Sequence, residues 1–187
     1  ARDCRSLTDI GIAKAAIESL LLRFYSQYCS VIFWFLLAGP IAALTYRLVL
    51  AVSWQWHYRR PGFARFSRPA RATVKLLTLP GAVTGAIAVM LASSIPGSVR
   101  GWRNAKARDF TSRLLALFGG ALGIQLGGPA IYSGIKWRYP RVGGERQVRY
   151  SDMHRAKRTI LWAASLYVAL SCTFFIVLWH VSGRGGL

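Results

Sequence analysis

Long apolar stretches alternate with short basic ones along this chain. Four stretches contain no Asp, Glu, Lys or Arg, namely residues 24–46, 76–99, 114–135 and 159–183. Each is long enough to cross a hydrocarbon core of about 30 Å, which takes about 20 helical residues. The last stretch has Trp162 and Trp179 near its ends, as the aromatic belts of membrane helices predict. The pattern indicates an all-α, polytopic integral membrane protein in which residues 1–187 form a single membrane domain.

The N-terminal part of the chain is predicted to begin with an amphipathic helix and to continue into a broken helical hairpin. Residues 1–23 hold the amphipathic helix, which Thr8 or Asp9 caps at its start. Its apolar stripe consists of Ile10, Ala13, Ile17, Leu20 and Leu21. The hairpin covers residues 24–58, because Pro40 lacks an N–H and its ring clashes with the preceding turn. We therefore expect two helical pieces, one on either side of Gly39-Pro40.

Residues 76–99 are predicted to form either one membrane helix or a re-entrant hairpin. The helix-breaking positions in the stretch are Pro80-Gly81, Gly85 and Pro96-Gly97. Basic loops flank the stretch on both sides, and a single crossing would put them on opposite faces of the membrane. The positive-inside rule favours the hairpin, which keeps both loops cytoplasmic. Irregular backbone at that depth needs cover from protein or a water-filled cavity.

The stretch 114–135 is rich in glycine, and its composition supports two interpretations. Gly119 and Gly123 form a GxxxG step, which lets helices approach closely, so composition alone favours helix packing. The alternative is that Gly127-Gly128-Pro129 exposes backbone N–H groups to an anionic ligand, as glycine-rich turns can. The stretch is neither a Walker A motif nor a GxGxxG fingerprint. We expect a glycine-rich membrane segment in either case.

Composition adds a strong positive charge to this picture. The chain has 25 Lys and Arg against 6 Asp and Glu, a formal net charge of +19, while 53% of its residues are hydrophobic. So much apolar sequence is not typical of a soluble nucleic-acid-binding protein or of a disordered basic tail. The cations gather in loops at residues 59–75, 100–113 and 136–158. We interpret them as orientation signals beside an anionic lipid membrane, with the loops cytoplasmic and with no nucleic-acid partner.

The cysteines and histidines give no sign of a metal site. They are Cys4, Cys29, Cys172, His57, His154 and His180. They form no CxxC pair and no ligand cluster, so we predict neither a disulfide framework nor a metal centre. Residue 1 is Ala, and no signal peptide opens the chain, so we expect the C-terminal portion of a longer protein.

Three blocks of the sequence resemble the CobD/CbiB cobalamin biosynthesis proteins. The first block, similar to the family's RDT…AAVES run, is Arg2-Asp3, Leu7 and Ala15-Ala16-Ile17-Glu18-Ser19. The second is the apolar run Phe33–Arg47, with a Gly-Pro break and a Tyr-Arg end. The third is GALGIQLGGPAIYSG at residues 120–134, followed by a basic segment with Pro140 and Gly143-Gly144. The blocks occur in the family's order and cover nearly the whole chain.

The resemblance implies an adenosylcobinamide-phosphate synthase of the bacterial inner membrane. Such an enzyme joins adenosylcobyric acid to (R)-1-aminopropan-2-ol phosphate by ATP-dependent amide ligation, which implies a corrinoid substrate, ATP and Mg²⁺. This chemistry needs cations that hold phosphates and a polar group that deprotonates the incoming ammonium. The resemblance assigns catalysis to Asp3 and Glu18. It assigns substrate or phosphate binding to Arg2, Arg47, Gly127, Gly128 and Tyr132. It leaves open whether the protein forms a homo-oligomer or binds a partner subunit.

Other interpretations of the same residues stay open. Glu18 can pair with Lys14 on a helix surface, and Arg47 can extend from a helix to the membrane interface. Leu21-Leu22-Arg23 and Leu48–Ser53 replace polar and acidic runs of the family, so carboxylates suited to Mg²⁺ are absent there. One alternative is an AmpE-like regulatory or signalling membrane protein without catalysis, although the block at 120–134 favours the cobalamin interpretation. A transporter or channel subunit is least favoured, because no intramembrane run of ionisable residues marks a pathway.

Overall fold

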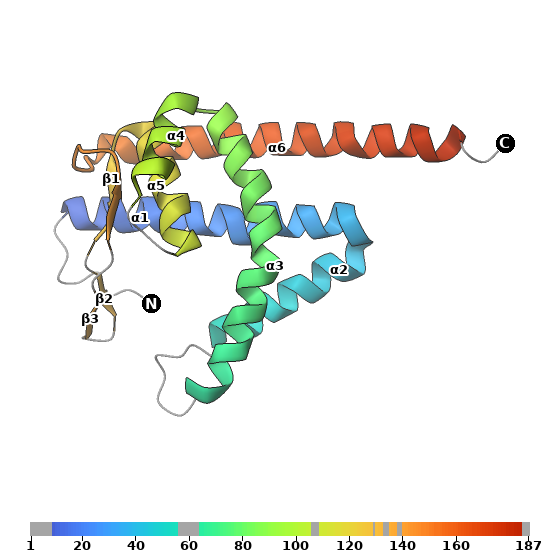
Figure 1. The fold of residues 1–187 in the computed structure, drawn as a ribbon, viewed down its shortest axis with the longest axis horizontal. Coiled ribbons are helices and arrows are strands. Elements are labelled where there is room, and N and C mark those ends of the chain that lie inside the picture. The colour runs from blue at the N-terminus through green and yellow to red at the C-terminus, as the bar shows by residue number, and fades with distance from the viewer. Residues whose placement is uncertain are drawn as a thin grey trace. The chain divides into compact units, whose positions relative to one another are not determined.

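The computed structural model is built mainly of helices. It describes residues 9–55, 64–105, 109–128, 130–132, 135–137 and 140–184. Short strands interrupt the helices only within residues 125–143 of this described part (Figure 1). Tertiary contacts divide the chain into two compact units. The first unit comprises the residues up to Leu22 together with Ala86–Ala164, and the second comprises Arg23–Gly85 together with Ser165–Leu187.

A long helix with one sharp bend opens the described chain. α1 (Asp9–Arg23) runs directly through η1 (Phe24–Cys29), a single π-helical turn, into α2 (Ser30–Gln55). Gly39 has a φ of 81° and a ψ of −173°, which are not helical values. Figure 1 shows the resulting sharp turn within α2. The bend lies at the Gly39-Pro40 step, where the proline cannot continue the helical hydrogen bonds of the preceding turn.

α3 (Ala64–Leu91) corrects one expectation, because it runs unbroken through Pro80-Gly81. The chain turns instead at residues 92–94, before α4 (Ile95–Asn104). Ser94 caps α4, since its side chain accepts a hydrogen bond from the Gly97 N–H over 3.3 Å. The stretch 76–99 therefore forms the end of a long helix and the start of a short one, which agrees with the predicted membrane helix and not with the re-entrant hairpin.

Close packing between α2 and α3 in the second unit explains why α3 tolerates Pro80 and Gly81. An ideal Cβ added to Gly81 would lie 2.6 Å from the Ser30 Oγ, so only glycine allows this approach. Ser30 Oγ donates to the Thr78 carbonyl over 3.2 Å, and Trp34 Nε1 donates to the Leu77 carbonyl over 2.9 Å. Side chains of neighbouring helices commonly satisfy backbone groups near a proline inside a membrane helix. The Pro-Gly step thus serves helix packing and not chain reversal.

The glycine-rich stretch 114–135 is not one membrane segment, which is a second correction. α5 (Phe110–Leu122) ends at Gly123, whose left-handed φ of 68° caps the helix. The strands that follow are β1 (Gln125–Gly127), β2 (Ala130–Tyr132), β3 (Ile135–Trp137) and β4 (Arg141–Gly143). β1 pairs antiparallel with β4, and β2 pairs antiparallel with β3. At 13 residues, α5 is too short to cross about 30 Å of hydrocarbon.

α6 (Ser151–Arg184) is a helix of 34 residues that contains the predicted stretch 159–183. The segments long and apolar enough to cross a membrane in the described chain are Ile10–Trp54, Ala72–Leu91 and Ser151–Val177. Many of their large apolar side chains are exposed, as positions facing lipid require; Ile41 and Leu76 are examples. The chain is therefore an all-α polytopic membrane protein, with a helix broken at Gly39-Pro40.

α4 and α5 pack directly against each other in the first unit (Figure 1). Gly97 and Gly101 of α4 face Ala116 and Gly120 of α5. An ideal Cβ on Gly97 would lie 2.7 Å from the Gly120 carbonyl oxygen, and a Cβ on Gly101 would overlap the Ala116 carbonyl. Small residues spaced four apart are a common way for helices to approach closely in membranes. The helix contact uses Gly120, whereas the predicted step from Gly119 to Gly123 does not lie at it.

Candidate functional site

Glu18 and Gly127, both predicted site residues, meet in the first unit. The Gly127 N–H donates to Oε1 of Glu18 over 2.8 Å, so a carboxylate on α1 holds the end of β1. Gly127 has a positive φ of 73°, and the Pro140 carbonyl closes the space that a Cβ would need. The Gly128 N–H donates to that carbonyl over 3.2 Å. Both amides that we expected an anionic ligand to use therefore have acceptors inside the chain.

The other predicted site residues lie in separate settings. Arg2 and Asp3 lie outside the described residues. Arg47 is exposed on α2, in the second unit. Tyr132 ends β2, and its side chain lies outside the described part of the structure. The described geometry of the predicted site is thus that of Glu18 and the two glycines.

A pocket of about 410 Å³ opens in the first unit beside α4, α5 and the loop that follows β4. Its lining consists of Gly97, Arg100, Gly101, Asn104, Gly120, Gly123, Gly143, Gly144, Glu145 and Arg146. Because glycine dominates, backbone groups make up much of the wall, and these are strong hydrogen-bonding groups. The charged side chains at the wall are Arg100, Glu145 and Arg146. We call this cavity the glycine pocket.

Close packing requires glycine on the loop side of the glycine pocket as well. Gly143 has a φ of 99°, and an ideal Cβ there would lie 2.8 Å from the Gly119 Cα of α5. The Gly144 N–H donates to the Ile124 carbonyl over 2.8 Å. Ile124 is fully buried, so the loop is tied to the core of the first unit. The backbone that lines the pocket is therefore held in place from both sides.

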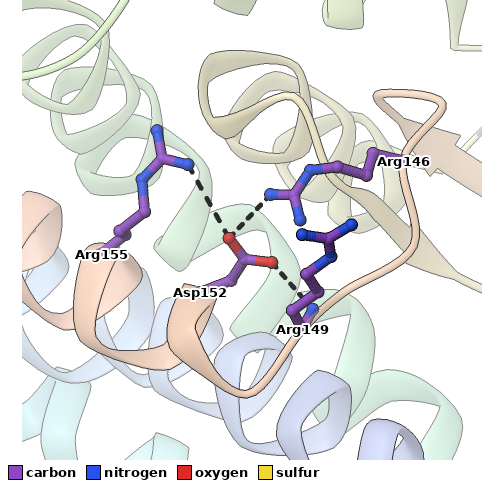
Figure 2. Close-up of polar contacts among 4 residues, drawn as sticks. All are labelled: Arg146, Arg149, Asp152 and Arg155. Carbon is purple, nitrogen blue, oxygen red and sulfur yellow. Dashed lines mark hydrogen bonds and ion pairs between the residues drawn. The ribbon is translucent and has the colours of Figure 1, made fainter.

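A buried carboxylate holds Arg146 at the edge of the glycine pocket (Figure 2). Asp152 lies in the first turn of α6 with its side chain only 3% exposed, and Arg146 Nη2 donates to its Oδ1 over 2.7 Å. The Arg149 N–H donates to Oδ2 over 2.8 Å, and Arg155 Nη1 lies 3.8 Å from Oδ1. The hydrogen bond to Asp152 raises the pKa of the Arg146 guanidinium above its usual value. One carboxylate faces the guanidiniums of Arg146 and Arg155, so this pair of ion contacts keeps a net positive charge.

Two further pockets lie on the same unit. One, of about 540 Å³, adjoins the glycine pocket and is lined by Ile95, Pro96, Val99, Arg100, Arg103 and Asn104. It shares Arg100 and Asn104 with the glycine pocket and adds the Arg103 guanidinium, so the face of α4 is strongly cationic. The other, of about 390 Å³, is mainly apolar and lies between α1 and the start of α6, with Leu20 and Ile160 in its wall.

The carboxylates of the described chain do not assemble into a metal site. Asp109 caps α5 by accepting from the Ser112 N–H over 3.3 Å, while Glu18 and Asp152 hold Gly127 and Arg146. No group of three or more His, Cys, Asp or Glu residues able to share a metal ion occurs among the described residues. Mg²⁺ bound with a nucleotide usually needs one or two carboxylates besides the phosphates. The carboxylates of the described residues are thus engaged singly, with no cluster of three or more metal-ligating side chains among them.

The fold and the site define a class of protein, a helical polytopic membrane protein with a cationic, glycine-walled pocket outside its long apolar helices. A family model described as CobD/Cbib protein matches residues 1–160, so the chain belongs to that family. The cobalamin biosynthesis protein CobD of Chromobacterium violaceum is 31% identical over 95% of this chain and 58% of the relative.

Other relatives carry the same name. The CobD protein of Stutzerimonas stutzeri is 34% identical over 76% of this chain and 48% of the relative. That of Mycobacterium tuberculosis is 29% identical over 83% of this chain and 52% of the relative. The chain therefore spans about half the length of the curated relatives it matches. No solved structure matches it significantly.

Sequence reasoning missed the glycine pocket for a geometric reason. Arg100 and Arg146 lie in two different basic loops, where each is interpreted as an orientation signal. Only the packing of α4 on α5 and the loop after β4 bring them to one cavity. One signal was available, because Glu145 and Asp152 are the two acidic residues within the basic run 136–158. An isolated carboxylate among so many cations is a candidate for a specific ion pair.

Proposed function

We propose that this chain, alone or as part of a longer protein, serves cobalamin biosynthesis as an adenosylcobinamide-phosphate synthase. The reaction forms an amide between a carboxyl group of adenosylcobyric acid and the amine of aminopropanol phosphate, with ATP as the energy source. The observation that carries the proposal is the family match over residues 1–160, together with relatives named as cobalamin biosynthesis proteins. The AmpE-like alternative has no comparable support.

The chemistry of this reaction makes two demands on the protein. Phosphate groups of ATP and of the amine substrate must be held by donors or cations, and the incoming ammonium must lose a proton before it attacks. In this proposal, the arginines of the glycine pocket and of α4 are the cations that hold the phosphate groups. When bound, ATP supplies the group that activates the carboxyl. The described residues contain no cluster of three or more His, Cys, Asp or Glu side chains that could hold the accompanying Mg²⁺.

Glu18 is the described carboxylate that the family resemblance assigns to the proton transfer. The hydrogen bond from the Gly127 N–H fixes the orientation of its carboxyl group, which general acid–base catalysis requires. The same bond gives Glu18 a structural role at the end of β1. Replacing Glu18 by Gln separates the two roles, because an amide oxygen still accepts from Gly127 but an amide group is not a base.

We propose that the protein lies in the bacterial inner membrane as a multi-pass protein with the basic loops 100–113 and 136–158 in the cytoplasm, and that a single crossing by α3 puts the basic start of α3 on the opposite face. Short loops rich in Lys and Arg remain on the cytoplasmic side during insertion. The loop regions 100–113 and 136–158 both belong to the first unit, where the cationic pockets lie. ATP and a soluble phosphate ester are also cytoplasmic, so this orientation gives the pockets access to both. The partners are then a corrinoid substrate and anionic lipids, with a homo-oligomer or a partner subunit still to be tested.

Complementation tests the proposed function directly. The full-length gene is introduced into a bacterium that lacks its own adenosylcobinamide-phosphate synthase, and growth is measured on cobyric acid. Vector alone and the Glu18→Gln variant run beside it, and immunoblotting of membranes confirms that each protein is present. We expect growth with the wild type and its loss with Glu18→Gln. Growth with both keeps the function and removes Glu18 as the base, whereas no growth with wild-type protein in the membrane rejects the proposed enzyme.

A further inference from the structure

The charges around the glycine pocket are of both signs and come from two elements. Arg100 lies on α4, while Glu145 and Arg146 lie in the loop between β4 and α6. A guanidinium presents several N–H donors in a planar fork that matches the oxygens of a phosphate. A carboxylate is the matching acceptor for an ammonium group. The wall therefore complements a small molecule that carries a phosphate at one end and an ammonium at the other.

The rest of the wall argues against a nucleotide as the occupant. The residues of the wall other than its three charged ones are glycines and Asn104, with no aromatic or aliphatic side chain among them. Sites for drug-sized or cofactor ligands are lined mainly by apolar and aromatic side chains, which a purine needs for its faces. A wall without aromatic or aliphatic side chains favours a small ligand that is recognised through its charged groups. The pocket volume of about 410 Å³ accommodates one with bound water.

The contact with Asp152 leaves Arg146 available to such a ligand. Its guanidinium has five N–H donors, and the bond to Asp152 Oδ1 uses one of them. The Arg146 side chain is 37% exposed, whereas the Asp152 side chain is 3% exposed. The buried carboxylate thus holds the Arg146 guanidinium (Figure 2), and the Arg146 side chain stays partly exposed. This arrangement lowers the conformational entropy that Arg146 would lose on binding a phosphate.

We propose that the glycine pocket binds a small aminoalkyl phosphate, with the phosphate against Arg100 and Arg146 and the ammonium against Glu145. Asp152 is the positioning residue for Arg146. This assignment rests on the proposed function, in which an aminoalkyl phosphate is the amine substrate. The pocket is a binding position separate from the Gly127-Gly128 turn, whose amides already have acceptors within the chain, so the ammonium has to move from Glu145 to Glu18 before the proton transfer assigned to Glu18.

A membrane lipid could present the same pair of charged groups to the glycine pocket. The headgroup of phosphatidylethanolamine also carries a phosphate and an ammonium, and the protein lies in a membrane. The test therefore uses the full-length protein in nanodiscs of phosphatidylcholine alone and in nanodiscs that also contain phosphatidylethanolamine. If the lipid is the occupant, it competes with the soluble ligand in the second preparation only, and the competition disappears in Arg146→Gln.

Calorimetric titration measures binding of 1-aminopropan-2-yl phosphate to the protein in these nanodiscs. Propyl phosphate, which lacks the ammonium, and 1-aminopropan-2-ol, which lacks the phosphate, are titrated in parallel. Arg100→Gln and Arg146→Gln should each weaken both phosphates by about tenfold or more, since hydrogen bonds to a charged group are involved. Glu145→Gln should weaken only the aminoalkyl phosphate. Arg158→Gln, which removes an exposed charge on α6 outside the pocket wall, is the matched control.

Clear outcomes overturn the proposal. Equal affinity of the wild type and of Arg100→Gln for the aminoalkyl phosphate rejects the site. Arg100 is suited to this test because it is not among the residues that form ion pairs with Asp152, so its replacement leaves that cluster in place. Equal weakening by Arg158→Gln shows that only the net charge matters and also rejects it. The complementation assay is independent of these titrations. If the wild type supports growth but Arg100→Gln binds the ligand as well as the wild type does, the proposed function stands and the pocket is rejected. If binding depends on Arg100 but the wild type does not support growth, the pocket stands and the proposed function is rejected.

Discussion

The Gly127 N–H donates to Oε1 of Glu18 over 2.8 Å, although the two residues are 109 positions apart in the sequence. This bond ties α1 to the end of β1 inside the first unit. It joins two of the three blocks that carry the family resemblance, which the sequence shows only as separate motifs. Glu18 therefore has two separable roles, a structural one through this hydrogen bond and a proposed chemical one as a base.

Glu18→Ala is expected to destabilise the protein more than Glu18→Gln. Alanine leaves the Gly127 N–H without this acceptor, which costs about 1 kcal/mol for a partly buried group, whereas glutamine keeps an acceptor oxygen. For a chain of this size that cost corresponds to a fall in Tm of about 2–4 °C per kcal/mol. Thermal unfolding of the purified variants in detergent measures the difference. Identical melting temperatures for the two variants would show that the bond contributes little.

Gly101→Ala is expected to separate α4 from α5. The new Cβ would overlap the Ala116 carbonyl, and the backbone there cannot move aside as a flexible side chain would. Overpacking of this kind costs about 1–3 kcal/mol. Thr111→Ala, at an exposed position on α5, is the control and should leave the melting temperature nearly unchanged. A Gly101→Ala protein as stable as this control would contradict the close contact between the two helices.

Gly39→Ala is expected to destabilise the bend in α2 through backbone strain alone. The φ of 81° and ψ of −173° fall in a region that is essentially restricted to glycine, and no atom lies within 4 Å of the Cβ position. Strain in that region costs about 1–3 kcal/mol. Leu44→Ala, an exposed position in the same helix, serves as control. Chemical denaturation of both variants in mixed micelles gives the comparison, and equal stability would mean that alanine straightens the helix without cost.

Asp152→Asn is expected to loosen Arg146 while leaving most of the fold intact. The substitution keeps an acceptor oxygen but removes the charge that faces Arg146 and Arg155, and hydrogen bonds to charged groups contribute about 1.5–3 kcal/mol. A positioning role predicts a weaker affinity for the aminoalkyl phosphate, with Arg146 still able to bind it. Titration of Asp152→Asn beside Arg146→Gln checks this, and the affinity of Asp152→Asn should fall between those of the wild type and Arg146→Gln. Unchanged affinity would show that Asp152 serves stability only.

Cysteine labelling is expected to place the cationic loops in the cytoplasm. Asn104→Cys and Gln147→Cys are both exposed positions, and each can be introduced after Cys4, Cys29 and Cys172 are replaced by serine. The positive-inside rule predicts that a membrane-impermeant maleimide labels them in inverted vesicles but not in intact spheroplasts. Labelling of either position in spheroplasts would contradict the proposed orientation.

The apolar pattern was a good guide where a helix is long and its environment uniform. Residues 159–183 lie within α6, and Gly39-Pro40 marks the bend in α2, because both signals are local to one helix. The same reasoning was wrong for Pro80-Gly81 and for residues 114–135. In the first case Ser30 and Trp34 of another helix satisfy backbone carbonyls beside the proline. In the second, Gly123 ends α5 after 13 residues, and neither composition nor charge distinguishes this from a longer helix.

The sequence by itself determined the membrane class, the family and the presence of three basic loops, since each follows from residue order and composition. Only the tertiary structure decided which cations share a site. Arg100 and Arg146 lie in different loops, and they line one pocket because glycines at 97, 101 and 120 let α4 and α5 approach while Asp152 holds Arg146. Contacts between residues distant in the chain depend on packing, which no local pattern specifies.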